Sequence, residues 1–547
     1  MRKIYIVIVL SLLALPSFAK KDKTEATSNQ TLDAIKHVEV YNTVLRELEI
    51  NYDDTLNHDE LLKMSLGHML YSLDPYTNYI PASDDETVKR LRTGQYGGVG
   101  SRIMLVDGKP YLIEPMYGMP AQVNGLRAGD EIIEIDGVKC KDKSISEISE
   151  MLRGKPQTEL TIIVQREGYK KPIKKTFLRA LVQEPPIPYY AKVADGIGYI
   201  ILYDFVDRTA ADFEIALNSL VEQHNITKLI IDLRGNGGGL VSQAVDIASL
   251  FLPKGTEVVS MRGIHESNNV VYKTRHMPRY PDMELLFLVD GNSASASELL
   301  SGAMQDFDRA FILGERTFGK GLVQNIRQLP YDSYLKITTG KYYLPSGRCV
   351  QAIDYANRQN GTARVIPDSL TKEFRTVKGR IVRDGGGILP DSVITDQFTY
   401  NISHYMFLKN LYFKYANKYV LAHQTIAPAS EFSLTDEEYN DFCQFVIQSG
   451  FTYRLESEKY LQDLKEMVKY EGYDDLTNEL FEQLTAKLQP NVETDLVRFR
   501  ADVQKMLEQE IIKRYYYQHG EIEYNARFDK WLKTAIEILQ KTNAKIQ

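Results

Sequence analysis

The residues best suited to chemistry lie between positions 291 and 324. The apolar run at 285–289 predicts a buried strand, which leads into the small residues 291–297. Glu298 and the apolar residues after it predict a helix that begins at this turn. A serine at such a turn lies beside backbone amides that no helix bond uses, so a nucleophile and an anion-stabilising donor can act together there.

A lysine in this stretch could act as the base that a serine nucleophile needs. Lys320 has a glycine on each side, follows a predicted strand at 310–313, and precedes Gln324 by four residues. A free lysine has a pKa of roughly 10.4 and is protonated at neutral pH, so a lysine base must be made neutral by its surroundings. Apolar residues at 318, 322 and 323 predict burial, which disfavours the charged amine.

Together these residues resemble the catalytic segment of the carboxyl-terminal processing peptidases, also called tail-specific proteases. The Ser-Ala-Ser-Glu run, an Arg-Ala-x-x-x-Gly-Glu segment, Thr-Phe-Gly-Lys-Gly and a later glutamine are all present, and the likeness covers roughly residues 60–395. The resemblance implies a Ser-Lys dyad, with Ser295 as nucleophile and Lys320 as base. Gln324 would orient Lys320 if this segment is helical; the alternative is that Gln324 only packs.

A glycine-rich run follows another predicted strand, at 228–233, and resembles the family's oxyanion-hole segment. Glycine is required where a backbone N–H approaches a substrate carbonyl closely. The resemblance implies that Gly238 or Gly239 is one donor, with the amide of Ala296 as the second. A phosphate-binding loop is the alternative reading, but the run lacks a Gly-Lys-Ser/Thr ending.

Residues 96–183 resemble a PDZ domain, with a characteristic strand and turn at 128–137. Such domains bind a protein's carboxyl terminus by adding it to a sheet edge, and backbone amides of a glycine-rich loop face the carboxylate. The expected loop residues are Gly97, Gly98, Val99 and Gly100, although an ordinary glycine turn is the alternative. The sequence does not decide whether the groove is open.

Composition excludes several classes of function. The net charge of −7 gives no electrostatic support for binding nucleic acid. Three cysteines do not form a disulfide framework, and no His, Cys or acidic cluster has metal-ligand spacing, so no cofactor is expected.

The amino terminus has the pattern of a secretory signal peptide at residues 1–19. A basic start precedes a short apolar core at 4–15, and Ser17-Phe18-Ala19 forms a small-x-small cleavage site. Export to a periplasm is expected, and the alternative is that the segment stays as a membrane anchor. The polar residues 20–30 predict a disordered leader.

The chain is expected to be a multidomain α/β (α+β) protein. Residues 31–95 predict an N-terminal helical region, in which the Leu-Asp-Pro at 73–75 reads as a helix stop. The PDZ domain at 96–183 and a peptidase core at 184–395, built from a β-sheet and helices, come next. Residues 396–547 predict a C-terminal helical domain whose aromatic residues form a core, with homo-oligomer formation or adaptor docking as its candidate role.

The resemblance implies an exported serine endopeptidase that captures unstructured protein tails with free carboxyl termini and cleaves them. One alternative is a non-catalytic PDZ scaffold that binds protein tails and needs neither Ser295 nor Lys320. A hydrolase of non-protein substrates on the same core is the other, and the PDZ domain argues against it.

Overall fold

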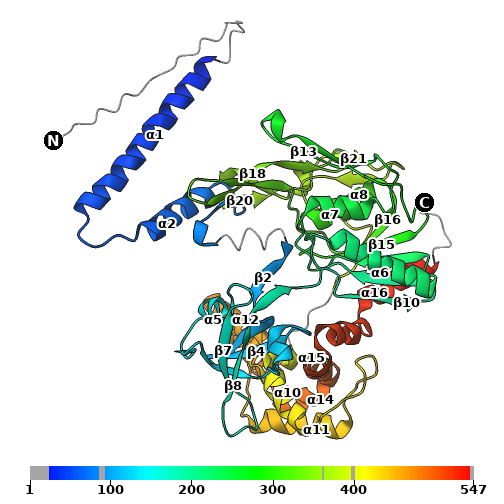
Figure 1. Ribbon diagram of the computed structural model, residues 1–547. Coiled ribbons are helices and arrows are strands. Elements are labelled where there is room, and N and C mark those ends of the chain that lie inside the picture. Colours follow the sequence, from blue (N-terminus) through cyan, green and yellow to red (C-terminus); the bar gives the residue numbers. More distant parts are fainter. Residues whose placement is uncertain (1–23, 85–92, 360–361, 396–400, 542–547) are drawn as a thin grey trace. The chain divides into compact units, whose positions relative to one another are not determined.

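The computed structural model describes residues 24–84, 93–359, 362–395 and 401–541, and the chain divides into two units, Met1–Ser72 and Leu73–Gln547 (Figure 1). The predicted signal peptide at residues 1–19 lies outside the described residues. Within the described ranges, no helix is both long enough and apolar enough to span a membrane.

The first unit contains helices α1 (Thr24–Asn51) and α2 (His58–Tyr71). Residues 24–30, expected to be a disordered leader, are helical; no glycine or proline interrupts α1, and each residue added to an existing helix gains a hydrogen bond. The Asn57 side chain begins α2 by accepting the Glu60 N–H. Helix α2 ends at Tyr71, and the Leu-Asp-Pro segment at 73–75 follows it, where Pro75 disfavours a helical conformation of Asp74. Within the rest of the predicted range 31–95, the described residues include a short 3-10 helix at Ala82–Asp84.

A six-stranded sheet forms the centre of the second unit. Its strands pair in parallel except for β10, which is antiparallel to β11. In spatial order they are β10 (Tyr189–Ala194), β11 (Ile197–Ile201), β12 (Lys228–Asp232), β15 (Glu284–Val289), β16 (Ala310–Gly314) and β23 (Ser392–Val393). The predicted core strands at 228–233, 285–289 and 310–313 are therefore confirmed.

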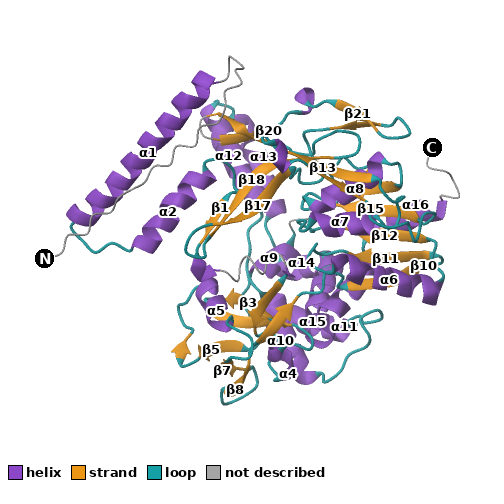
Figure 2. Cartoon of the chain, turned by 45° about the horizontal axis from the view of Figure 1, so that its top comes forward, coloured by secondary structure: helices purple, strands orange, loops and turns teal. Residues whose placement is uncertain are grey.

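Helices cover both faces of this sheet (Figure 2). Ile231 and Phe287 pack in a core with α6 (Thr209–His224), α7 (Val241–Ala248) and α8 (Ala296–Asp306). Neighbouring residues such as Ile230 and Leu286 instead pack against α16 (Lys530–Lys541). Successive strand residues point to opposite faces, so strands covered on both faces read as continuous apolar runs. Each such buried side chain stabilises the fold by about 1.5–3 kcal/mol.

An antiparallel sheet brings the segment after Pro75 to the lysine segment. Its order is β1 (Asn78–Ile80), β18 (Tyr334–Tyr343), β13 (Glu257–Arg262) and β14 (Val270–Lys273), and β17 (Leu322–Gln328) also pairs with β18. Two hairpins follow β18 along the chain: β19 (Ile353–Gln359) pairs with β20 (Thr362–Val365), and β21 (Glu373–Arg375) pairs with β22 (Ile381–Arg383).

The predicted PDZ region contains its own sheet, in the order β3 (Ser101–Val106), β4 (Lys109–Pro115), β5 (Glu131–Ile135), β7 (Glu159–Gln165) and β8 (Ile173–Leu178), with β6 (Val138–Lys139) beside β5. Helices α4 (Pro120–Val123) and α5 (Ile145–Leu152) accompany it, and β2 (Gln95–Gly98) pairs with β9 (Ala180–Gln183). In this part of the described chain β3 has only one neighbouring strand, so its other edge is open to an added strand.

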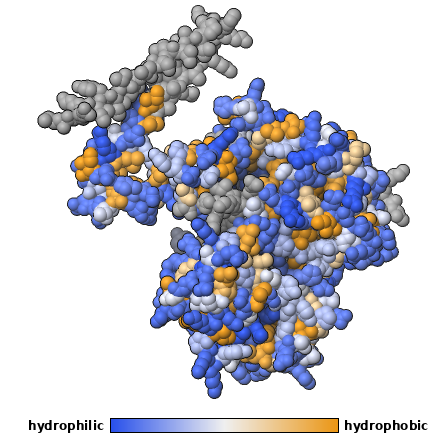
Figure 3. Space-filling model, in the orientation of Figure 1, coloured by the Kyte–Doolittle hydropathy of each residue, from blue (hydrophilic) through white to orange (hydrophobic). Residues whose placement is uncertain are grey.

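The carboxyl-terminal region is helical, as predicted. It contains α9 (Ile402–Leu408), α10 (Leu411–Ala422), α11 (Asp436–Gln448), α12 (Glu456–Tyr470), α13 (Asp474–Leu488), α14 (Val492–Arg498) and α15 (Arg500–Ala526). Tyr412, Phe442 and Tyr524 lie in its core, which confirms that its aromatic residues build an interior. Figure 3 shows hydrophobic residues scattered among hydrophilic ones on the visible surface of this unit.

Candidate active site

Ser295 lies at the turn between β15 and α8, immediately before the first helical residue. Its φ of 54° and ψ of −115° place a non-glycine residue in a region that L-amino acids rarely adopt. The side chain is largely buried, with 8% of the residue exposed. Backbone strain of this kind persists only where surrounding contacts impose it, and a strained strand-to-helix turn is a known way to present a nucleophile.

Glu298 supplies the contacts that impose this turn. Its carboxylate is fully buried and accepts the N–H of Ser295 at 2.9 Å. It also accepts the N–H of Lys320 at 2.8 Å, the N–H of Gly319 at 2.7 Å and the Thr317 hydroxyl at 2.6 Å. Burial raises the pKa of Glu298, while the four hydrogen bonds oppose that shift by favouring the carboxylate. One side chain therefore joins the serine turn to the lysine loop.

Lys320 lies just before β17, with its amine 4.5 Å from the centre of the Tyr76 ring. Burial lowers the pKa of Lys320, and the positive charge of Lys336 lowers it further, against the raising effect of Glu298 and Asp74. A neutral amine can accept a proton from a hydroxyl.

The backbones of Ser295 and Lys320 lie close together, because the N–H groups of both residues donate to the same Glu298 oxygen, Oε2. In the part of the chain that the structure describes, Ser295 Oγ and Lys320 Nζ share no hydrogen bond. Catalytic hydrogen bonds are often long before substrate binds and shorten in the complex.

The glycine run packs directly on the serine turn. A Cβ placed on Gly238 would lie 2.7 Å from Ser295 Cβ and 2.9 Å from the amide nitrogen of Ala296, so only glycine fits. The Gly238 N–H donates to Asn236 Oδ1 at 2.8 Å and is occupied. The N–H groups of Gly239 and Ala296 donate to no acceptor among the described residues. Of the two predicted glycines, Gly239 has the available donor.

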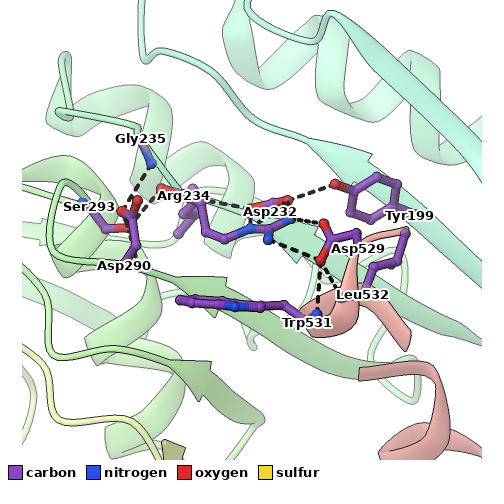
Figure 4. Close-up of polar contacts among 10 residues, drawn as sticks. Tyr199, Asp232, Arg234, Gly235, Asp290, Ser293, Asp529, Trp531 and Leu532 are labelled. Atoms are coloured by element: carbon purple, nitrogen blue, oxygen red, sulfur yellow. Dashed lines mark hydrogen bonds and ion pairs between the residues drawn. The ribbon is translucent and has the colours of Figure 1, made fainter. Parts of the chain in front are cut away.

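Further hydrogen bonds join the glycine run to the serine turn. Asp290 Oδ1 accepts the N–H of Gly235 and the N–H of Ser293, each at 3.0 Å (Figure 4). The Ser297 hydroxyl donates to the Asn236 carbonyl at 2.9 Å. Asp290 and Asn236 were not predicted as site residues, because the bonds by which they join the two segments reach partners 55 and 61 positions away in the sequence.

Gln324 does not lie one helical turn beyond Lys320, because this segment is strand β17. The prediction that Gln324 orients Lys320 assumed that this segment is helical, and that assumption was wrong. Pairing with β18 overrides any local helical preference. The Gln324 amide donates to Thr338 Oγ1 at 3.2 Å, and Thr77 Oγ1 lies 3.3 Å from the same oxygen. Asp74 accepts the Thr77 hydroxyl at 3.0 Å.

The Leu-Asp-Pro segment is therefore more than a helix stop. Asp74 holds the Thr77 hydroxyl, Thr77 contacts Thr338 of β18, the strand that pairs with the Gln324 strand, and Tyr76 lies over the amine of Lys320. The Tyr76 ring also meets the Tyr355 ring of β19 edge-on, at 6.1 Å between ring centres. The sequence offered only the position of this segment, since its partners Lys320, Thr338 and Tyr355 lie far away along the chain.

The predicted PDZ loop borders a cavity of about 380 Å³ between β3 and α5. Gly97 and Gly98 end strand β2, and the N–H groups of Val99 and Gly100 have no acceptor in the described ranges. Gly100 has a φ of +67°, and a Cβ there would lie 2.3 Å from Met119 Cβ. Free amides beside an open strand edge match the way a peptide terminus is bound.

Three family models match parts of the chain. The model for "Peptidase family S41" matches residues 196–360, which hold the serine turn, the lysine and the glycine run. The model described as "PDZ domain" matches residues 114–166. Residues 402–539 match "Probable PDZ-protease, C-terminal helical domain".

Curated relatives match well over half of the chain. A carboxy-terminal-processing protease of Bartonella bacilliformis is 31% identical over 330 residues, which is 60% of this chain and 75% of that protein. A protein named "Probable CtpA-like serine protease" of Staphylococcus aureus is 29% identical over 375 residues, or 66% of this chain and 74% of that protein. Among solved structures, the photosystem II D1 C-terminal processing protease is 25% identical with a TM-score of 0.37, covering 64% of this chain and 86% of that one.

Proposed function

Because this chain belongs to peptidase family S41, among the carboxy-terminal-processing proteases, we propose that it is an exported endopeptidase that works through a Ser295–Lys320 dyad. That it is a serine-type peptidase with a PDZ domain follows from the family. The observation that carries the dyad is the buried Glu298 carboxylate, which holds the strained serine turn and the lysine loop on one side chain.

In the proposed reaction, the neutral amine of Lys320 takes the Ser295 hydroxyl proton as Oγ attacks the scissile carbonyl. The carbonyl oxygen becomes an anion and accepts the N–H groups of Gly239 and Ala296. When the C–N bond breaks, the Lys320 ammonium returns its proton to the leaving amine, and the acyl group stays on Ser295. Water then adds to the ester, with Lys320 again the base, and the carboxylic acid leaves.

The PDZ groove supports the choice of substrate. We propose that a protein tail adds to the open edge of β3 with its terminal carboxylate at the amides of Val99 and Gly100. A non-catalytic scaffold is not favoured, because a tail-binding scaffold needs neither a strained serine nor a desolvated lysine. Export and a periplasmic location rest on the pattern of residues 1–19, either removed as a signal peptide or kept as an anchor.

The C-terminal helical domain offers a surface for another chain, as a homo-oligomer or an adaptor. Tyr460, Leu464 and Met467 are exposed along one stripe of α12, and Leu476 and Leu480 are exposed on α13. Apolar side chains at helical spacing on two neighbouring helices are typical of a helix-binding surface. Sedimentation of the intact protein, alone and with candidate partners, tests this part of the proposal.

The dyad is tested by two substitutions. Ser295→Ala should abolish cleavage of an unfolded protein while tail binding persists, because only Oγ is lost. Lys320→Arg should be equally inactive, since guanidinium stays protonated and cannot act as a base.

Ser297→Ala is the matched control, since it removes a buried hydroxyl from the same turn without touching the proposed nucleophile. It should keep much of the activity, losing only its bond to Asn236. Full cleavage by Ser295→Ala, measured as fragments on a gel, would refute the assignment.

A further inference from the structure

The last helix of the described chain, α16, reaches the glycine run although about three hundred residues separate them in sequence. Arg234 immediately precedes that run in the sequence. Its guanidinium lies between two carboxylates (Figure 4). Its Nη2 donates to Asp232 Oδ2 at 2.5 Å and to Asp529 Oδ2 at 2.6 Å, and Nη1 lies 3.3 Å from Asp529 Oδ1. Asp529 directly precedes the first residue of α16.

These charges are largely removed from water. The exposed fraction is 22% for the Arg234 side chain, 17% for Asp529 and 5% for Asp232. The indole of Trp531 covers one face of the guanidinium, with Arg234 Cζ at 5.3 Å from the ring centre. The Tyr199 hydroxyl donates to Asp232 at 2.6 Å. Buried charges are costly unless paired, so Arg234 has little freedom to move while both carboxylates are present.

The backbone of Arg234 transmits this constraint to the loop. Its own N–H donates to Asp232 Oδ1 at 3.0 Å, and the next N–H, of Gly235, donates to Asp290 at 3.0 Å. Three residues later, Gly238 packs on Ser295 and Ala296. The start of the glycine run is therefore held in place by contacts with the serine turn on one side and, through Arg234, with the start of α16 on the other.

Docking of α16 does not itself require the ion pair. Trp531, Leu532, Ala535 and Leu539 are buried against Ile230, Leu286 and other residues of the central sheet. Each buried large side chain contributes about 1.5–3 kcal/mol, which is enough to hold the helix. The ion pair between Asp529 and Arg234 lies at the end of α16 that faces the glycine run. Apolar packing already stabilises α16 on the sheet, and the ion pair adds a directional contact to it.

We propose that α16 positions the oxyanion loop, with Asp529 and Trp531 acting through Arg234 as positioning residues for the peptidase reaction. The C-terminal helical domain thereby completes the active site of the core. This inference rests on the proposed roles of Gly239 and Ala296 as oxyanion donors.

The substitution Asp529→Asn isolates this contact. Asp529 Oδ1 accepts the N–H groups of Trp531 and Leu532, and an asparagine oxygen can keep both bonds at the helix start. The other atom becomes an NH₂ group that faces Arg234 Nη2, so attraction is replaced by donor-against-donor contact. Glu537→Gln, at an exposed position of the same helix, is the matched control for loss of one negative charge.

The measurements separate positioning from stability. With the concentration of active sites titrated by a serine-reactive probe, we expect Asp529→Asn to lower kcat for a peptide substrate by about tenfold or more with little change in KM, because displaced oxyanion donors act only in the transition state. A peptide aldehyde, whose adduct oxygen occupies the oxyanion position, should bind more weakly by a similar factor. Glu537→Gln should match the parent protein in both measurements.

An unchanged kcat per active site in Asp529→Asn would overturn the proposal, even if the melting temperature fell. If that variant does not fold, Arg234→Lys decides in the same assay: it keeps the charge but cannot bridge both carboxylates, so a normal kcat would also overturn the proposal. Ser295→Ala is measured beside them. Activity in Ser295→Ala refutes the dyad, whereas an inactive Ser295→Ala with a normal Asp529→Asn refutes only the role of α16.

Discussion

A second lysine, Lys336, lies in the electrostatic environment of Lys320, the proposed base. Lys336 lies on β18, opposite Asn78 of β1 and Ile326 of β17, and burial lowers its own pKa. Its charge adds to burial in lowering the pKa of Lys320. A second cationic group beside a lysine is a known way to hold that lysine neutral. Neither spacing nor composition pointed to Lys336, because β-sheet pairing alone brings it to the site.

We therefore expect Lys336→Met to move the midpoint of the pH dependence of acylation to higher pH. Only neutral Lys320 accepts the Ser295 proton. Acylation is therefore fast at pH values above the pKa of Lys320 and slows as the pH falls through that pKa. Removing the neighbouring positive charge raises that pKa, which lowers the rate at neutral pH and leaves the high-pH plateau unchanged. Burst kinetics with an ester substrate over a pH series provide the measurement.

Lys341→Met is the control for this titration, because it removes an exposed lysine from the same strand. Its midpoint should equal that of the parent protein. A midpoint that stays in place or moves down in Lys336→Met would show that Lys336 does not tune the base.

At the scale of elements, the sequence was most informative where a motif and a strand pattern coincided. The serine turn, with α8 starting at Ala296, and strands β12, β15 and β16 lie where the apolar runs predicted them. The segment after Lys320 differed, because seven residues carry too little periodicity to separate a helical turn from a strand. Its pairing with β18 is a tertiary contact that local sequence cannot specify.

The glycine run gives a prediction at this scale. Gly238→Ala should lower kcat by about a hundredfold, because the new Cβ meets the Ala294 carbonyl at 2.6 Å and Ser295 Cβ at 2.7 Å, and a φ of +100° is unfavourable for alanine. Gly237→Ala has no atom within 4 Å of its new Cβ and should keep most of the activity. Steady-state kinetics on one peptide compare the two. Equal activities would mean that the close packing on the serine turn is not needed.

Across the whole molecule, the parts that escaped prediction are those made by contacts between distant segments. The apolar runs at 228–233 and 285–289 indicated that these strands are buried, and Ile230 and Leu286 are indeed covered, but nothing in the runs identified α16 as the cover. Likewise, the 73–77 segment carried no sign of Tyr76 lying over Lys320. Local patterns predict which surfaces are buried, whereas the partner that buries them depends on topology.

The joint use of the PDZ groove and the dyad gives the last prediction. A substrate tail with a free carboxylate should be cleaved with a KM about tenfold or more below that of the same tail ending in an amide. The reason is that charge-assisted hydrogen bonds to the Val99 and Gly100 amides are worth about 1.5–3 kcal/mol. The value of kcat should change little, since the groove does not touch the reacting bond. A short peptide that spans only the cleavage site is the control, and its amidation should have no effect. Equal KM values for the acid and amide tails would mean that the carboxylate is not what the groove recognises.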